Sequence, residues 1–122
     1  MTDFVYDIEV YPNAFTCSVL EVNSQRTKTF EISTRTNDFG PFIEFCTRLG
    51  DVGARMIGYN NLGYDYPVIH YMLTELVDHG EWQHLTRKIK AFSDRIIHAP
   101  HDQRFAHVVW DSQQVVQQID LM

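Results

Sequence analysis

The sequence predicts an α/β layered domain built around a mixed sheet. Three observations support this fold class. The chain opens with three strand-like segments joined by short turns, it continues with segments whose apolar residues recur every three or four positions, and a short strand-like segment separates the first two of these helical segments. A meander followed by a strand between helices requires both antiparallel and parallel pairing, so we expect a mixed sheet with flanking helices.

The opening segments are expected to form an antiparallel meander. The first strand is predicted at about 3–10, after which Pro12 and Asn13 favour a turn. The second strand, at about 14–22, alternates apolar with hydroxyl side chains. The sequence NSQR then forms a hairpin into a third strand at about 27–33.

The middle of the chain is expected to contain helices and one short strand. The apolar spacing predicts a helix at about 38–49, a strand at about 54–60, a helix at about 66–78, and a third helix from about 81 into the nineties.

Polar and glycine residues mark the ends of these predicted helices. Asn37 or Asp38 can cap the start of the first helix, and Gly50 can end it. Gly80 lies just past the predicted end of the second helix.

The C-terminal part of the chain is predicted to be a loop, HAPHDQR, followed by two further strands. These strand candidates are FAHVVW at 105–110 and QQVVQQIDL at 113–121. The sequence stops on an apolar strand pattern without a turn or a polar tail. We therefore expect residues 1–122 to be a single domain that is truncated at its C-terminus.

The composition is typical of one globular domain in a reducing compartment. With 122 residues and 44% apolar content, the chain can bury a core, and Cys17 and Cys46 fall at positions expected to be buried in it. The formal charge of −6 argues against a protein that coats duplexes, although the mildly basic stretch 84–106 could contact a phosphate backbone or form a solvated helix face. We find neither a signal peptide nor an apolar run of membrane-spanning length, and expect a cytoplasmic protein with no membrane partner.

Two carboxylates interrupt the first strand, in the sequence FVYDIEVYPN. Because side chains alternate along a strand, Asp7 and Glu9 share one face with Val5, while the other face is wholly apolar or aromatic. Neighbouring anions repel each other and unpaired charge is costly to bury, so a divalent cation, which prefers carboxylate oxygen, is one interpretation. The alternative is an edge strand whose acidic face is solvated.

Asp65 is the second candidate site residue, in the sequence IGYNNLGYDYPVI. It follows a polar turn between a strand and the helix that starts near Tyr66. Loops that leave strand ends are common positions for sites in α/β sheets. The alternative is that Asp65 caps the helix, which is the commonest role of Asp at such a position.

Taken together, the two acidic motifs are similar to those of a known superfamily. The D-x-E motif at 7–9, followed by N-x-x-Y-D at 61–65, resembles the first two motifs of the 3′→5′ exonuclease domains in the ribonuclease H-like, four-carboxylate (DEDD) superfamily. The phrases YDIEVYPN and NNLGYDYPV carry a likeness to the proofreading domains of phage family B DNA polymerases. The likeness covers about residues 4–80, and the predicted β-β-β-α-β-α order fits that fold.

The resemblance implies a two-metal phosphodiester hydrolase that uses Mg²⁺ or Mn²⁺. By this likeness, Asp7 would bridge both ions, Glu9 would bind the ion that holds the attacking water, and Asp65 would bind the ion that stabilises the leaving 3′ oxygen. These three acids are the candidate catalytic and metal-binding residues, and an empty site should show raised carboxylate pKa values.

Asn61 and Tyr64 match family positions that hold the single-stranded substrate. An amide can bond to sugar or base edges, and an aromatic ring can stack on any base. A turn role for Asn61 and a core position for Tyr64 are the alternatives. The implied partner is the 3′ end of single-stranded DNA, in the host cytoplasm if the protein is phage-encoded, and a polymerase domain could follow this chain.

The sequence also departs from the family pattern. Val10 stands where proofreading domains often carry a small hydroxyl residue, and no Tyr-x3-Asp or His-x4-Asp motif follows residue 80, so the fourth carboxylate is missing. Asp111 and Asp120 are further acids that could support the metal ligands, although we interpret them as solvated or turn residues. The alternative function is therefore a catalytically weak or inactive remnant of this fold that binds nucleic acid or a protein.

Overall fold

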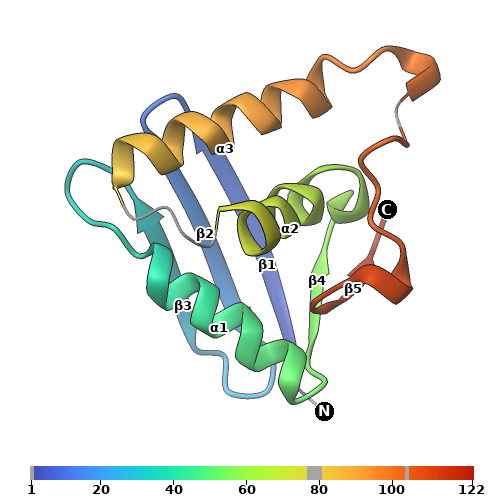
Figure 1. The fold of residues 1–122 in the computed structure, drawn as a ribbon. Helices are drawn as coiled ribbons and strands as arrows, with labels where there is room; N and C mark the ends of the chain where they lie inside the picture. The colour runs from blue at the N-terminus through green and yellow to red at the C-terminus, as the bar shows by residue number, and fades with distance from the viewer. Residues whose placement is uncertain (1, 77–80, 104) are drawn as a thin grey trace.

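The computed structural model describes residues 2–76, 81–103 and 105–122, which form a mixed five-stranded sheet with three α-helices (Figure 1). The strands are β1 (Asp3–Tyr11), β2 (Ala14–Glu21), β3 (Thr27–Ile32), β4 (Arg55–Gly58) and β5 (Gln117–Asp120). The helices are α1 (Phe39–Asp51), α2 (Tyr66–Glu75) and α3 (Trp82–Ile97), with a π-helical turn, η1 (Asn61–Asp65), directly before α2. Two short 3₁₀ turns, η2 (His101–Gln103) and η3 (Asp111–Gln113), follow α3.

The strand order in the sheet is β3-β2-β1-β4-β5. β1, β2 and β3 pair antiparallel as successive hairpins, whereas β4 pairs parallel with β1 and β5 pairs parallel with β4. The predicted mixed α/β architecture and its opening meander are therefore confirmed. Because β1 lies between β2 and β4, it is not the edge strand of the alternative interpretation, although its acidic face is exposed as that interpretation expected.

The three helices lie on one face of the sheet (Figure 1). Along β1, Tyr6 and Ile8 are buried beneath them, whereas Val5, Asp7 and Glu9 are exposed. This alternation is the predicted one, but the acids are not buried in a core strand. They lie on the open face in the described part of the chain, so the cost of burying charge does not by itself require a cation there.

The core lies between the helices and the face of the sheet that they cover. Phe42 of α1 packs against Phe15 of β2 and Phe30 of β3, with ring centroids 5.7 and 5.3 Å apart. Cys17 and Cys46 are both buried, as predicted, and burial raises the pKa of each thiol. The cysteines thus act as small core residues.

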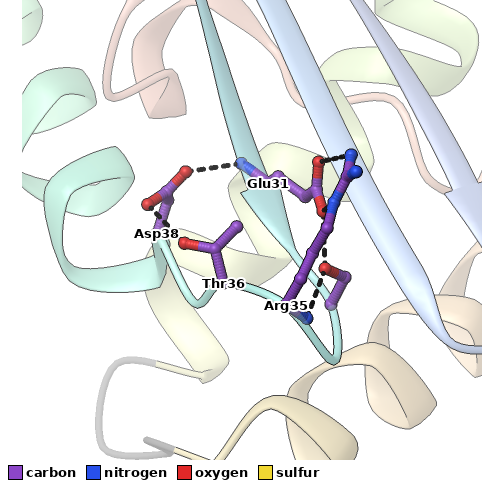
Figure 2. Close-up of polar contacts among 5 residues, drawn as sticks. Glu31, Arg35, Thr36 and Asp38 are labelled. Carbon is purple, nitrogen blue, oxygen red and sulfur yellow. Dashed lines mark hydrogen bonds and ion pairs between the residues drawn. The ribbon is translucent and has the colours of Figure 1, made fainter.

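A polar network fixes the turn from β3 into α1 (Figure 2). The Arg35 guanidinium donates to both carboxylate oxygens of Glu31, at 2.7 and 2.9 Å, and the Asp38 carboxylate accepts from the Glu31 backbone N–H at 2.9 Å. The Arg35 bonds, together with one from the Ser33 hydroxyl, lower the pKa of Glu31 to about 2. Of the two predicted caps, Asn37 accepts a hydrogen bond from the first N–H of α1, at 3.1 Å.

Two predicted helix ends differ from the structure. Gly50 lies inside α1, and the residue with a positive φ after the helix is Gly53, with φ 71°. A Cβ at Gly50 would lie 2.4 Å from the backbone oxygen of Val115, so close packing explains this glycine. The predicted end of the second helix, including Gly80, lies outside the described residues.

The predicted strand at 105–110 is wrong, because residues 105–107 form a turn and residues 108–110 are irregular. The last strand is also shorter than the predicted 113–121. The chain that enters it is held by a helix instead, since the Val115 backbone N–H donates to the Tyr66 hydroxyl of α2 at 2.8 Å.

Candidate active site

β1 places Asp7 and Glu9 side by side on the exposed face of the sheet. Their cross-strand neighbours on β2 are the hydroxyl residues Ser18 and Thr16. The Tyr11 hydroxyl donates a hydrogen bond to Glu9 Oε2 at 2.9 Å, and this bond raises the pKa of Tyr11. In the part of the chain that the structure describes, neither acid forms an ion pair. Two solvated carboxylates without a cationic side chain therefore stand at the centre of the sheet.

Asp65 connects the second motif to this strand. It makes no side-chain capping bond in α2, and its Oδ2 accepts a hydrogen bond from the backbone N–H of Ile8 at 3.2 Å. The paired register of β4 with β1 reaches only to Val5, so this N–H has no strand partner on that side. The Asp65 carboxylate accepts the hydrogen bond that a backbone carbonyl of a neighbouring strand would otherwise accept. The capping alternative for Asp65 is therefore wrong, and the residue lies against β1 between the two acids of the first motif.

The charge of Asp65 is poorly solvated and lies near other acids. The side chain is buried, and this burial, with the charges of Asp7 and Asp120, raises the pKa of Asp65 to about 6 despite the hydrogen bond from Ile8. The expected raised carboxylate pKa is thus present at Asp65.

The three predicted ligands do not form a closed cage as they stand. Among the described residues, no group of three or more His, Cys, Asp or Glu side chains lies close enough together to hold a metal ion. Glu9 is turned toward Tyr11, and Asp65 is turned toward Ile8. The donor set is nevertheless of the kind that hard divalent cations prefer, because all three groups are carboxylates.

Asn61 lies in a buried polar network rather than on a surface. Its Nδ2 donates to Gln118 Oε1 at 2.9 Å, and the Tyr6 hydroxyl donates to the same oxygen at 2.7 Å. The Gln118 Nε2 donates in turn to the Val116 backbone oxygen at 3.0 Å. Within the described structure, Asn61 Oδ1 is buried without a hydrogen-bond partner. The amide thus ties η1 to β1 and β5.

Tyr64 is half-buried, which agrees in part with the core position considered for it. Its hydroxyl shares a hydrogen bond of 2.6 Å with the Ser93 hydroxyl of α3, and its ring packs against the core. The same side chain lines an open groove of about 960 Å³ between η1 and the segment that follows α3. Tyr64 therefore contributes both to the packing of α3 and to the lining of this groove.

Asp120, for which a supporting role beside the metal ligands and a solvated or turn role were both considered, is bonded to the turn before α2. Its carboxylate accepts hydrogen bonds from the backbone N–H groups of Asn60, Leu62 and Met122, at 2.9, 3.1 and 3.0 Å. Asn60 adopts a left-handed conformation, with φ 56°. Asp120 therefore fixes the turn that carries Asp65, and a lone acid at the end of an apolar strand was the signal in the sequence.

Comparisons with known proteins give one structural neighbour to report. That neighbour is a family B DNA polymerase. It comes from the hyperthermophilic archaeon Pyrobaculum calidifontis, and the match has a TM-score of 0.49 and 18% sequence identity. It covers 99% of this chain but only 15% of the polymerase chain. No protein-family model and no curated protein matches the sequence.

The described helices are also too short or too polar to cross a membrane.

Proposed function

We propose that this chain is a metal-dependent 3′→5′ exonuclease domain that hydrolyses phosphodiester bonds at single-stranded DNA ends. The observation that carries the proposal is the contact of the Asp65 carboxylate with the Ile8 backbone, between Asp7 and Glu9. Residues more than fifty positions apart in the sequence meet there, and they are the residues of the two motifs that resemble the exonuclease superfamily. The proofreading part of a phage polymerase is the context that the motifs favour.

The arrangement of the sheet supports a ribonuclease H-like fold. The elements follow the order β-β-β-α-β-α, and the strand with the D-x-E motif is central. The second motif follows β4, the strand parallel to β1, so that Asp65 returns to the same edge of β1. This placement is what a site at the carboxyl ends of parallel strands requires.

Asp7, Glu9 and Asp65 would hold one or two Mg²⁺ or Mn²⁺ ions. The charge of Asp7 already raises the pKa of Asp65, and a bound cation would relieve this repulsion. To bind the cation, the Glu9 carboxylate would have to give up the hydrogen bond that it accepts from the Tyr11 hydroxyl. When bound, such ions make water more acidic and neutralise charge on the phosphate.

The chain's own residues would orient the substrate. Tyr64 lines a groove beside the turn that carries Asp65, and its ring can stack on a base whatever the sequence. The Asn61 side chain is buried within this turn. We therefore propose that Asn61 positions Asp65 through its hydrogen bond to Gln118 of β5, and does not contact the DNA.

The test is digestion of a single-stranded oligonucleotide with a labelled 5′ end, in the presence of Mg²⁺ or Mn²⁺. We expect successive shortening from the 3′ end. The variants Asp7→Asn and Asp65→Asn should lose more than about 100-fold in rate, because metal ligation supplies several kcal/mol of transition-state stabilisation. The matched control is Asp51→Asn, an exposed acid at the end of α1.

Equal digestion by wild type and both variants would refute the assigned site. Digestion by the wild type that persists in a chelator would refute the metal dependence. A 3′-blocked oligonucleotide that is cut as fast as the free one would refute the direction of hydrolysis.

A second candidate function is a non-catalytic module that binds nucleic acid or a protein. It is favoured by the absence of a three-residue metal cluster in the described residues and by the engagement of Glu9 with Tyr11. Oligonucleotide binding without any digestion in Mg²⁺ or Mn²⁺ would select this candidate.

A further inference from the structure

The groove beside the candidate active site carries two unusually exposed aromatic side chains. Phe105 and Trp110 line it from the segment after α3, and each is 65% exposed. Tyr64 of η1 lines the same groove. Exposed apolar side chains that gather around one hollow commonly mark an interaction site. Base stacking uses such rings, and it tolerates any base because every base has a π-face.

The charges around the groove suit a strand of nucleic acid. A second hollow shares Ala99 with the groove and is lined by Arg95, His98 and His107. These side chains can meet phosphate oxygens on the outer side of a bound strand. Asp94 also lines this hollow, and its carboxylate is paired with Lys90 of α3. The acid in the groove, Asp120, has its carboxylate occupied by three backbone N–H groups, which compensate its charge.

We propose that this groove binds single-stranded nucleic acid by stacking bases on Phe105 and Trp110, next to the nucleotide held at Tyr64. The proposal rests on the proposed function, because the turn that lines the groove also carries Asp65. It adds to that function a binding surface outside both acidic motifs. The bases lie in the groove, and the backbone passes toward Arg95 and His98.

The experiment measures Trp110 fluorescence in the full chain with Trp82 replaced by phenylalanine, since these are the two tryptophans. An oligothymidine of about ten nucleotides is added in EDTA, so that binding is measured without hydrolysis. We expect quenching of Trp110 emission. The double variant Phe105→Ala and Trp110→Ala should bind a labelled oligothymidine about ten-fold or more weakly, whereas Trp110→Tyr should keep most of the affinity.

Two controls separate stacking from charge and from unfolding. Val52→Ala removes an exposed apolar side chain after α1 and should leave the affinity unchanged. An abasic strand of equal length keeps the phosphates and should bind more weakly than the oligothymidine. The exposed positions of both aromatic residues mean that their replacement should not unfold the protein.

Unchanged affinity in the double variant, absence of Trp110 quenching, or equal binding of the abasic strand would each overturn the proposal. The outcome is independent of the digestion assay. If the chain digests DNA but Phe105 and Trp110 do not contribute to binding, the groove proposal is refuted and the proposed exonuclease function stands. If the bases stack but no digestion occurs, the exonuclease function is refuted and the groove proposal stands.

Discussion

At the scale of single residues, the site depends on what Asp65 bonds to. An acid at the start of a helix normally accepts a hydrogen bond from that helix, but here the carboxylate accepts one from Ile8 of the central strand. The bond holds a poorly solvated charge close to Asp7, and burial raises the pKa of Asp65 to about 6. This is a cost to folding that a site for cations can tolerate, because a bound ion would remove it.

Replacement of Asp65 by asparagine should stabilise the protein at neutral pH. The carboxyl loses its proton near pH 3.8 when unfolded and near pH 6 when folded, so the folded state binds the extra proton and stability falls as the pH rises through this range. The free energy of unfolding of Asp65→Asn should therefore exceed that of the wild type by about 1 kcal/mol at pH 7.5, after allowance for partial solvent screening. Near pH 4 the two free energies should become similar. Urea unfolding at both pH values tests this, and a variant that is less stable at pH 7.5 would contradict it.

The ionisation of Glu31 should have the opposite effect on how stability depends on pH. The hydrogen bonds from Arg35 and Ser33 lower its pKa to about 2, so its contribution to stability is present above pH 4.5 and is lost as the pH falls through 2 (Figure 2). Glu31→Gln should lower the melting temperature at pH 7, and the difference from the wild type should shrink in acid. A constant difference from pH 7 to pH 2 would show that ionisation of Glu31 is not the cause.

At the scale of elements, the ends of α1 show how packing overrides local preference. Gly40 and Gly50 lie in the same helix, where glycine is normally unfavourable. A Cβ at Gly40 would meet nothing within 4 Å, whereas one at Gly50 would collide with the Val115 backbone. The second glycine is therefore required by the close approach of the Val115 backbone, just before β5.

The two glycines form a matched pair for substitution by alanine. Gly40→Ala should stabilise the protein by about 0.5 kcal/mol, because it only improves helix propensity. Gly50→Ala should destabilise it by about 1–3 kcal/mol, because a backbone must move. Thermal unfolding of both variants measures the difference. A stabilising Gly50→Ala would mean that Val115 does not pack against this helix.

At the scale of the whole molecule, the three helices of the described residues lie on one face of the sheet, and these residues leave the acidic face open (Figure 1). The Asp7 charge raises the pKa of Asp65, and a cation bound at these carboxylates, as we propose, would relieve this repulsion. Binding of an ion to the folded state alone would therefore stabilise the entire cooperative unit.

Mn²⁺ should accordingly raise the melting temperature in a concentration-dependent way. A free Mn²⁺ concentration about five times its dissociation constant should increase the free energy of unfolding by about 1 kcal/mol. The shift should vanish in Asp7→Asn and persist in Asp51→Asn, which calorimetry at pH 7.5 can measure. An equal shift in both variants would place the ion elsewhere.

The sequence by itself determined the elements whose side chains repeat locally. The alternation of side chains along residues 3–33 was sufficient to predict the meander and the shared face of Asp7 and Glu9. The spacing of apolar residues was sufficient to predict the three helices of the described residues. The strand predicted at 105–110 failed because a short apolar run does not specify a partner strand.

Only the tertiary structure decided what the polar residues do. It gave Asp65 a partner on β1, buried Asn61 against Gln118, and made Asp120 the acceptor for the turn before α2. Each of these contacts joins positions more than fifty residues apart. Local periodicity holds no information about such pairs, because their meeting is fixed by the order of strands in the sheet.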